Sequence, residues 1–362
     1  MAKHYFTSES VTSGHPDKIC DLIADSILDE ALRQDPNAHM AVEATIKDDL
    51  ILVYGEASTR ADINYEQIAL SVMKQIGYEE EYHVIIKVNA QSAEISSAVE
   101  NDTLCAGDQG IMFGYACSET EELMPYPISA AHKLAAKLEE VRRQDPRLRP
   151  DGKTQVTCEY DDSRMKRIDT VVVSTQHTEG ITQKELYDLI REKVILPVCG
   201  SDIDEKTRIL VNPSGSFVLG GSWGDSGTTG RKIVVDSYGG FAPIGGGCFS
   251  SKDPTKVDRS AAYYARYVCR NIVANGLADR CQLQLSYAIG RAEPTSVYLK
   301  SFGTSAYTDE ELLAIVMKNF DFSVSNIISE LDLRRPIYAA TVNYGHFGKK
   351  DLPWEQFKKI TV

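Results

Sequence analysis

The chain has 362 residues, 43% of them hydrophobic and 25% charged, so it is long enough for two or three globular domains and too apolar to be disordered. Its net charge of −13 excludes a general nucleic-acid binder, because no excess of Lys and Arg is present to neutralise a phosphate backbone. No run approaches the roughly 20 apolar residues of a membrane span, and the first residues lack the apolar core of a signal peptide. We therefore expect a cytoplasmic protein.

The first 80 residues predict a helix, two strands and a second helix. These elements are a helix over 16–34, strands over 39–46 and 50–58, and a helix over 64–77. Pro16 is a favoured first residue of a helix, Asn64 is a favoured cap, and Gly77 is a favoured end.

The same order returns twice along the chain. The predicted elements are a helix over 127–144, strands over 154–160 and 167–176 and a helix over 182–195, then a helix over 257–276, strands over 281–290 and 295–303 and a helix over 308–320. Thr182 with Glu185, and Thr308 with Glu311, form the capping box that begins a helix. We predict an α+β protein of three similar units, although this order is common enough to arise three times without a repeat.

Three stretches are rich in loop-forming residues: 142–155, 214–232 and 91–110. The last is polar and Ser-rich and lacks a clear period. It is typical of a mobile surface segment that serves as a lid, and a plain connector fits the same composition.

The residues before the first helix have the pattern of an anion site. His15 falls at its N-cap and Asp17 in its first turn, where unpaired N–H groups and the helix dipole favour a phosphate with a bound metal. A neutral His15 could donate to a leaving oxygen. An ordinary cap and an ordinary first-turn acid explain the same two residues.

Two glutamates lie in otherwise apolar predicted strands. Glu43 and Glu56 would each need a cation or hydrogen bonds if buried there. Strand alternation gives the alternative, because Glu43 shares a face with Ala41 and Thr45 and can face water.

Basic residues follow glycines or turns at several places. They are Lys153, Arg231, Lys232, Lys252 and Lys256. The stretch over 245–263 mixes the last two of these lysines with acids, which suits phosphates held together with divalent metals, although the spacing is not that of a P-loop. A flexible loop followed by a solvated, charged helix start explains the same stretch. Phe217 could stack on a base or pack in the core. The eight cysteines have no metal-binding spacing and are expected to be small core residues.

At these residues the chain closely resembles the methionine adenosyltransferase family, also called S-adenosylmethionine synthetases, of the bacterial type. The matching motifs run in order from end to end: FTSESVTSGHPDKICD, CAGDQGIMFGYA, LRPDGKTQV, GDSGTTGRKIVVDSYGG, GGGCFSSKDPTKVDRSAAYYARYV, GLADRCQLQLSYAIGRAEPTS and YGHFG. The resemblance implies that the sulfur of L-methionine attacks C5′ of ATP, a reaction of the EC 2.5.1.6 type. It also implies hydrolysis of the released tripolyphosphate to pyrophosphate and phosphate.

The resemblance assigns roles residue by residue. The catalytic residues would be His15, Lys153, Arg231 and Lys252, and the ATP site would add Asp151, Phe217 and Lys232. The methionine site would comprise Glu56, Gln91, Asp108, Asp225 and Lys256. Two Mg²⁺ per active site would be bound by Asp17 and Asp258, and one K⁺ per subunit by Glu43.

The resemblance also implies an architecture. Three interleaved α+β domains, over 3–100, 113–219 and 221–358, would surround a pseudo-three-fold axis, with residues 91–106 as a lid over the active site. The implied assembly is a homotetramer, a dimer of dimers with active sites at the dimer interface. Neither a nucleic acid nor a membrane is an implied partner.

The chain departs from the family pattern at a few positions. Ser216 stands where many relatives carry a basic residue, Cys105 and Cys248 replace small residues, and the lid is a few residues shorter than in some relatives.

Two other functions would use a similar phosphate site, an ATP-dependent phosphotransferase and an ATP-sensing oligomer without chemistry. A phosphotransferase would form ADP, and an ATP sensor would show no methionine-dependent turnover.

Overall fold

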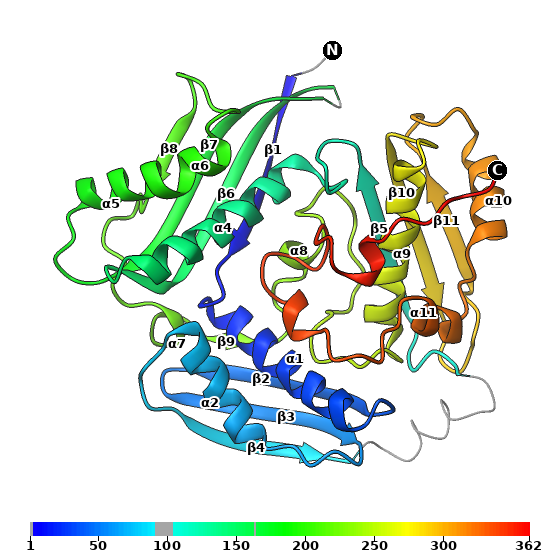
Figure 1. Ribbon diagram of the computed structural model, residues 1–362, viewed down its shortest axis with the longest axis horizontal. Coiled ribbons are helices and arrows are strands. Elements are labelled where there is room, and N and C mark those ends of the chain that lie inside the picture. The colour runs from blue at the N-terminus through cyan, green and yellow to red at the C-terminus, as the bar shows by residue number, and fades with distance from the viewer. Residues whose placement is uncertain (1–2, 91–103, 163) are drawn as a thin grey trace.

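The computed structural model describes residues 3–90, 104–162 and 164–362 (Figure 1). Its main elements are β1 (Lys3–Val11), α1 (Pro16–Gln34), β2 (His39–Lys47), β3 (Leu50–Ser58), α2 (Tyr65–Ile76), β4 (His83–Asn89), β5 (Gly110–Cys117), α4 (Tyr126–Gln144), β6 (Leu148–Asp161), β7 (Arg164–His177), α5 (Gln183–Ile190), α6 (Leu196–Cys199), β8 (Arg208–Val211), α7 (Gly221–Gly224), β9 (Gly227–Thr228), α8 (Ile233–Asp236), α9 (Val257–Ala274), β10 (Arg280–Tyr287), β11 (Ser296–Lys300), α10 (Asp309–Asn319) and α11 (Val324–Glu330). A π-helical turn over Arg191–Ile195 joins α5 to α6.

The three predicted units are confirmed. They are α1–β2–β3–α2, α4–β6–β7–α5 and α9–β10–β11–α10. Both capping boxes form, at Thr182 with Glu185 and at Thr308 with Glu311, and Gly77 ends α2 in the left-handed conformation. The fold is therefore α+β, as predicted.

Each unit builds a separate sheet that also takes a strand from another part of the chain. The sheets have the orders β4-β3-β2-β9, β1-β6-β7-β8 and β11-β10-β5. Figure 1 shows the three sheets around a central region that contains α8. Since β1, β5 and β9 all cross between units, the three parts of the chain are interleaved.

One expectation about a loop needs correction. Residues 142–155 were expected to be a loop, but α4 runs to Gln144 and β6 begins at Leu148. The turn-forming residues Pro150 and Gly152 lie within that strand, because pairing of its first residues with β7 overrides their local preference and a register shift between Leu148 and Gly152 accommodates them. Strand β1 itself was not predicted, since its mixed polar residues give no strand signal alone.

The sheet of the first unit has one covered face and one open face. Helix α1 packs on β2, with α2 beside it, and the residues of β2 alternate between buried and half-exposed. Met40, Val42 and Ala44 are buried, while Glu43 lies on the open face. Glu43 is therefore not inside the core, and strand alternation describes its position correctly.

Most of the cysteines are buried, as expected from the sequence. Cys248 is half-buried and the other seven cysteines are buried. In the described part of the chain, no single helix has the length and hydropathy of a membrane span. Helices α10 and α11 together have that length and hydropathy, but the pair is bent by 71°.

Candidate functional site

The N-terminus of α1 presents a histidine as a neutral hydrogen-bond donor. His15 is the N-cap, in an extended conformation fixed by the following Pro16, and its Nδ1 accepts the N–H of Asp17 at 3.2 Å. Because Nδ1 is an acceptor, the proton of the neutral ring lies on Nε2. Burial, reinforced by Lys232 and Lys153, lowers the pKa of His15 to about 3. The ring is therefore neutral at physiological pH.

Asp17 connects helix α1 to the segment after α7 that carries Arg231 and Lys232. It is buried, forms an ion pair with Lys232, lies 3.6 Å from Nε of Arg231, and accepts the N–H of Thr228 at 3.0 Å. Burial alone would raise the pKa of Asp17, but the hydrogen bonds from Lys232 and Thr228 outweigh it and lower that pKa. Asp17 is thus ionised among cations.

Strand β6 supplies the next residues. Its pairing with β1 sets Lys153 opposite Val11, close enough for its charge to lower the pKa of His15. Asp151 accepts the N–H of Gly221 at 2.8 Å, and its other oxygen is buried without a hydrogen-bond partner among the described residues. Burial raises the pKa of Asp151 to about 6. Asp151 therefore retains an acceptor for a ligand.

We call this set of residues the His15 group. Its members are His15, Asp17, Asp151, Lys153, Asp225, Arg231 and Lys232. Asp225 is exposed, and its charge acts on both His15 and Asp151. Three of the seven, Lys153, Arg231 and Lys232, were expected to hold phosphates. The structure brings all seven together at the start of α1.

Phe217 lies outside both apolar cores of the described chain. It is half-buried, its N–H donates to Nε2 of His177 at 3.0 Å, and the neighbouring Leu219 is 68% exposed. Core packing therefore does not explain this aromatic ring. Its neighbour Ser216 is exposed.

A second set of predicted residues lines a pocket of about 310 Å³. We call it the Lys252 group, and its members are Glu56, Asp108, Lys252, Lys256 and Asp258. Nζ of Lys252 lies 2.5 Å from Asp258 in the first turn of α9, and Nζ of Lys256 lies 3.1 Å from Asp253. The opposite charges predicted in the 245–263 loop are thus paired with one another.

Strand β2 joins the two groups. Thr45 pairs with Thr228, next to the His15 group, and Ala41 forms a bridge with Lys252. The two contacts are four residue steps apart along the strand, which places them about 13 Å from each other. Glu43 lies between them, half-buried, and accepts a hydrogen bond from Tyr54 at 3.2 Å.

The remaining predictions concern the lid and the metals. Gln91 and residues 92–103 of the predicted lid lie outside the described residues. No cluster of three or more metal-binding side chains occurs in the described part of the chain. Mg²⁺ in phosphate sites needs only one or two carboxylates, because phosphate oxygens and water complete its shell. Single carboxylates such as Asp17 and Asp258 fit that pattern.

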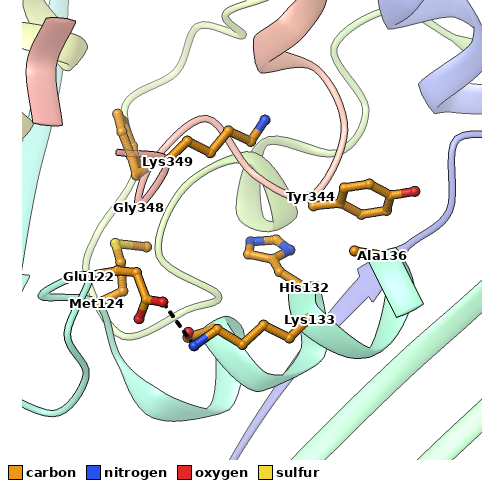
Figure 2. A pocket seen from close by; sticks show the side chains of 10 residues that line it. Glu122, Met124, His132, Lys133, Ala136, Tyr344, Gly348 and Lys349 are labelled. Atoms are coloured by element: carbon orange, nitrogen blue, oxygen red, sulfur yellow. Dashed lines mark ion pairs between the residues drawn. The ribbon is translucent and has the colours of Figure 1, made fainter. Parts of the chain in front are cut away.

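A separate pocket of about 230 Å³ contains none of the predicted residues (Figure 2). It lies between α4 and residues 344–349, and an ion pair between Lys133 and Glu122 stands at one side. Nδ1 of His132 bonds to Ser10 at 2.8 Å, and Lys349 donates to two backbone carbonyls. Its lysines are thus engaged within the protein.

Sequence reasoning missed a layer of buried charges beneath the His15 group. Nζ of Lys18 lies 2.6 Å from Asp236 and 3.0 Å from Asp21, and Asp25 forms an ion pair with Arg259. The available signal was the recurrence of aspartates four residues apart in 17–29, a spacing that places them on one helical face.

Comparison with known families assigns nearly the whole chain. Residues 3–103 match the model of the N-terminal domain of S-adenosylmethionine synthetase, residues 103–217 match its central domain, and residues 219–356 match its C-terminal domain.

Proposed function

Because the chain belongs to the S-adenosylmethionine synthetase family, which forms S-adenosylmethionine from ATP and methionine, we propose that the His15 and Lys252 groups bind these two substrates. The chain is a methionine adenosyltransferase, EC 2.5.1.6. Our proposal concerns which residues act and how.

In the proposed reaction the sulfur of methionine attacks C5′ of ATP. A C–S bond forms, the C5′–O bond breaks, and the electron pair leaves with the tripolyphosphate, so a sulfonium and a highly charged leaving group appear together. Water then cleaves one P–O–P linkage to give pyrophosphate and phosphate. Catalysis would come from positioning and from stabilising the leaving charge, without a covalent intermediate.

His15 would donate Nε2–H to the leaving oxygen. The observation that carries this role is its geometry: Nδ1 is occupied by the N–H of Asp17, and burial beside Lys232 and Lys153 keeps the ring neutral. A neutral donor strengthens its hydrogen bond as charge develops on the oxygen, and it need not lose a proton.

The phosphates would be held by cations from both groups. Lys153, Arg231 and Lys232 would bind from the His15 side, and Lys252 and Lys256 from the other. Lys232 and Lys252 now pair with Asp17 and Asp258. Exchange of these partners is the proposed event on substrate binding, in which each lysine turns to a phosphate.

Asp17 and Asp258 would hold two Mg²⁺, and Glu43 one K⁺. Mg²⁺ held by these carboxylates would supply positive charge that offsets the charge of the phosphates. Among the described residues Glu43 has one hydrogen-bond donor, Tyr54, and it lies on the open face of the strand. Its carboxylate can therefore accept a monovalent cation there.

The nucleoside and methionine would occupy the remaining residues. The free oxygen of Asp151 offers an acceptor to the nucleotide, and Phe217 offers a ring to its base. Glu56, Asp108 and Asp225, with Gln91, would bind methionine beside Lys256. The exposure of Ser216 is compatible with one phosphate contact fewer than in relatives that carry a basic residue there.

We further propose a homotetramer, a dimer of dimers whose active sites lie between subunits. The open face of the β4-β3-β2-β9 sheet presents Leu50 and Ile85, which are 41% and 53% exposed, next to the line from Thr45 to Ala41. A second copy covering this face would bury its apolar side chains and bring a second His15 group toward the Lys252 pocket.

Product analysis tests the proposed reaction. The chain is incubated with ATP, L-methionine, Mg²⁺ and K⁺, and products are followed by mass spectrometry and ion chromatography. Equal amounts of S-adenosylmethionine, pyrophosphate and phosphate, all dependent on methionine, are expected. Formation of ADP would indicate a phosphotransferase, and nucleotide binding without products would indicate an ATP sensor.

A further inference from the structure

One face of α1 carries a row of four aspartates. Asp17, Asp21, Asp25 and Asp29 stand four residues apart, and all four are buried. Like charges at this spacing destabilise a helix, and a buried carboxylate is costly unless hydrogen bonds or cations compensate it. The four aspartates of this row therefore need compensating partners, and those partners show what the row holds in place.

Every member of the aspartate row accepts backbone N–H groups from a distant part of the chain. The bonds are from Thr228 to Asp17 at 3.0 Å, from Gly230 to Asp21 at 2.8 Å, from Ser251 to Asp25 at 3.0 Å, and from Tyr338 and Ala339 to Asp29 at 2.8 and 2.9 Å. All of these donors lie in loops or at the edges of short elements. Helix α1 thus holds three separate C-terminal segments on one rigid face.

Asp21 fixes the segment that carries Arg231 and Lys232. It binds the N–H of Gly230, whose φ of +82° places it in the left-handed region. At the far end of the segment, Asp236 is held by Lys18, which also lies 3.0 Å from Asp21. Both ends of residues 230–236 are therefore fastened to α1, with the two cations between them.

Asp25 fixes the backbone at Lys252 in the same way. It binds the N–H of Ser251, a residue held in the left-handed region with φ +81°, where non-glycine residues are strained. Arg259 pairs with Asp25 and also donates to the carbonyl oxygen of Lys252 at 3.1 Å. The backbone on both sides of the Ser251–Lys252 peptide is thus bound by one buried ion pair.

We propose that Asp21 and Asp25 are positioning residues: Asp21 sets the places of Arg231 and Lys232, and Asp25 that of Lys252, by holding both loops on α1. The inference rests on the proposed phosphate roles of those cations. Neither aspartate touches substrate, and both act through backbone N–H groups. Errors near 1 Å in such positions are enough to lower phosphate binding and turnover.

Asp29 is the matched control in the same row. It makes two backbone hydrogen bonds of the same kind, but to residues 338–339, which carry none of the proposed phosphate ligands. Its loss should weaken the fold without moving the cations. Replacement by Asn removes one acceptor oxygen and the charge at each of the three positions while keeping the side-chain shape.

The experiment compares Asp21→Asn, Asp25→Asn and Asp29→Asn with the unaltered enzyme. Binding of inorganic tripolyphosphate is measured by calorimetry, together with KM for ATP, kcat and the unfolding midpoint. The first two variants should raise the Kd for tripolyphosphate and KM for ATP at least about tenfold, whereas Asp29→Asn should stay within about twofold of the unaltered enzyme. All three should lower the unfolding midpoint.

The outcomes separate this inference from the function on which it rests. If the unaltered enzyme does not bind tripolyphosphate, the proposed phosphate roles fail and the inference fails with them. If it binds and all three variants bind equally well, or weaken only in step with their loss of stability, then the positioning role alone is wrong.

Asp25→Asn leaves Arg259 buried without its partner and can unfold the chain. If this variant does not fold, hydrogen exchange on the unaltered enzyme tests the proposal instead. Peptides over 228–232 and 249–253 should contain amides that exchange as slowly as those of α1, because buried carboxylates bind them. Exchange at the rate of an open loop would overturn the proposal.

Discussion

At the scale of single residues, the chemistry of the site depends on which side-chain atoms already form hydrogen bonds or ion pairs. Nδ1 of His15 is taken by the helix, so only Nε2–H is free to act, and Lys232 and Lys252 are held by carboxylates that would be metal ligands. The charges of the site are therefore balanced internally before ATP and its cations bind.

Replacing His15 by Asn tests its proposed role. Asn is a good N-cap, so α1 should keep its start and the unfolding midpoint should not change. Loss of the Nε2–H donor should lower kcat at least about 100-fold. Steady-state kinetics measures the effect, with His4→Asn, on the exposed start of β1, as the control. Near-normal turnover by His15→Asn would rule out the role.

The identity of the residues in the site could be predicted to a large extent, but not their arrangement. The N-cap position of His15, the first-turn position of Asp17 and the half-exposed face of Glu43 all follow from local spacing. The approach of Arg231 and Lys232 to Asp17 does not, because it depends on contacts more than 200 residues apart in the chain. Local patterns contain no information on such pairing.

At the scale of elements, helix starts were predictable and strand partners were not. Both capping boxes and the glycine end of α2 appear as predicted, because they depend on residues within one turn. Strand β1 and the first residues of β6 were missed, since pairing with distant strands decides their conformation: β1 pairs with β6 from Lys153 onward, and the first residues of β6 pair with β7.

Thr308→Ala should lower the stability of the fold without changing turnover. Thr308 accepts the N–H of Glu311 and caps α10, away from both groups of site residues. The loss should cost about 1 kcal/mol of unfolding free energy. Urea unfolding should show the decrease and kcat should stay the same, as for the equivalent Thr182→Ala on α5. A lower kcat would mean that α10 communicates with the site.

The open face of β2 leads to a prediction on potassium. If Glu43 binds K⁺, turnover after exhaustive dialysis should be faster in potassium than in sodium buffer, and Glu43→Gln should lose the difference. Glu66→Gln, on the exposed side of α2, serves as the control. Equal rates of the unaltered enzyme in the two buffers would remove the assignment.

At the scale of the whole molecule, three sheets exchange strands and enclose buried ionisable groups. The three-unit plan could be predicted because each unit has its own local pattern, whereas the exchange of β1, β5 and β9 could not. The boundaries 3–100, 113–219 and 221–358 remain a prediction, as does the pseudo-three-fold axis.

Buried histidines should make the fold sensitive to acid. Burial, with Lys349 and Lys18 nearby, lowers the pKa of His132 from 6.5 to about 3. Between these values the unfolded chain binds a proton at this residue and the native chain does not, so native stability falls as pH falls from 6.5 toward 3. Above pH 6.5 the residue contributes no pH dependence.

His132→Gln should flatten that dependence. The slope of unfolding free energy against pH should decrease by up to about 1.4 kcal/mol per pH unit inside the window, as expected for one proton. Denaturant unfolding at several pH values between 4 and 7 measures the slope. An unchanged slope would show that His132 is not the group responsible.

The central claim is that one active site combines the His15 group of one copy with the Lys252 group of another. The most direct measurement is complementation between two inactive variants, His15→Asn and Lys252→Met, which are co-expressed with different tags and purified as mixed dimers. One of the two sites in each mixed dimer would then be intact, so methionine-dependent formation of S-adenosylmethionine should return to about half of the unaltered rate. Mixed dimers as inactive as either parent would contradict the claim and place both groups of each site in one chain.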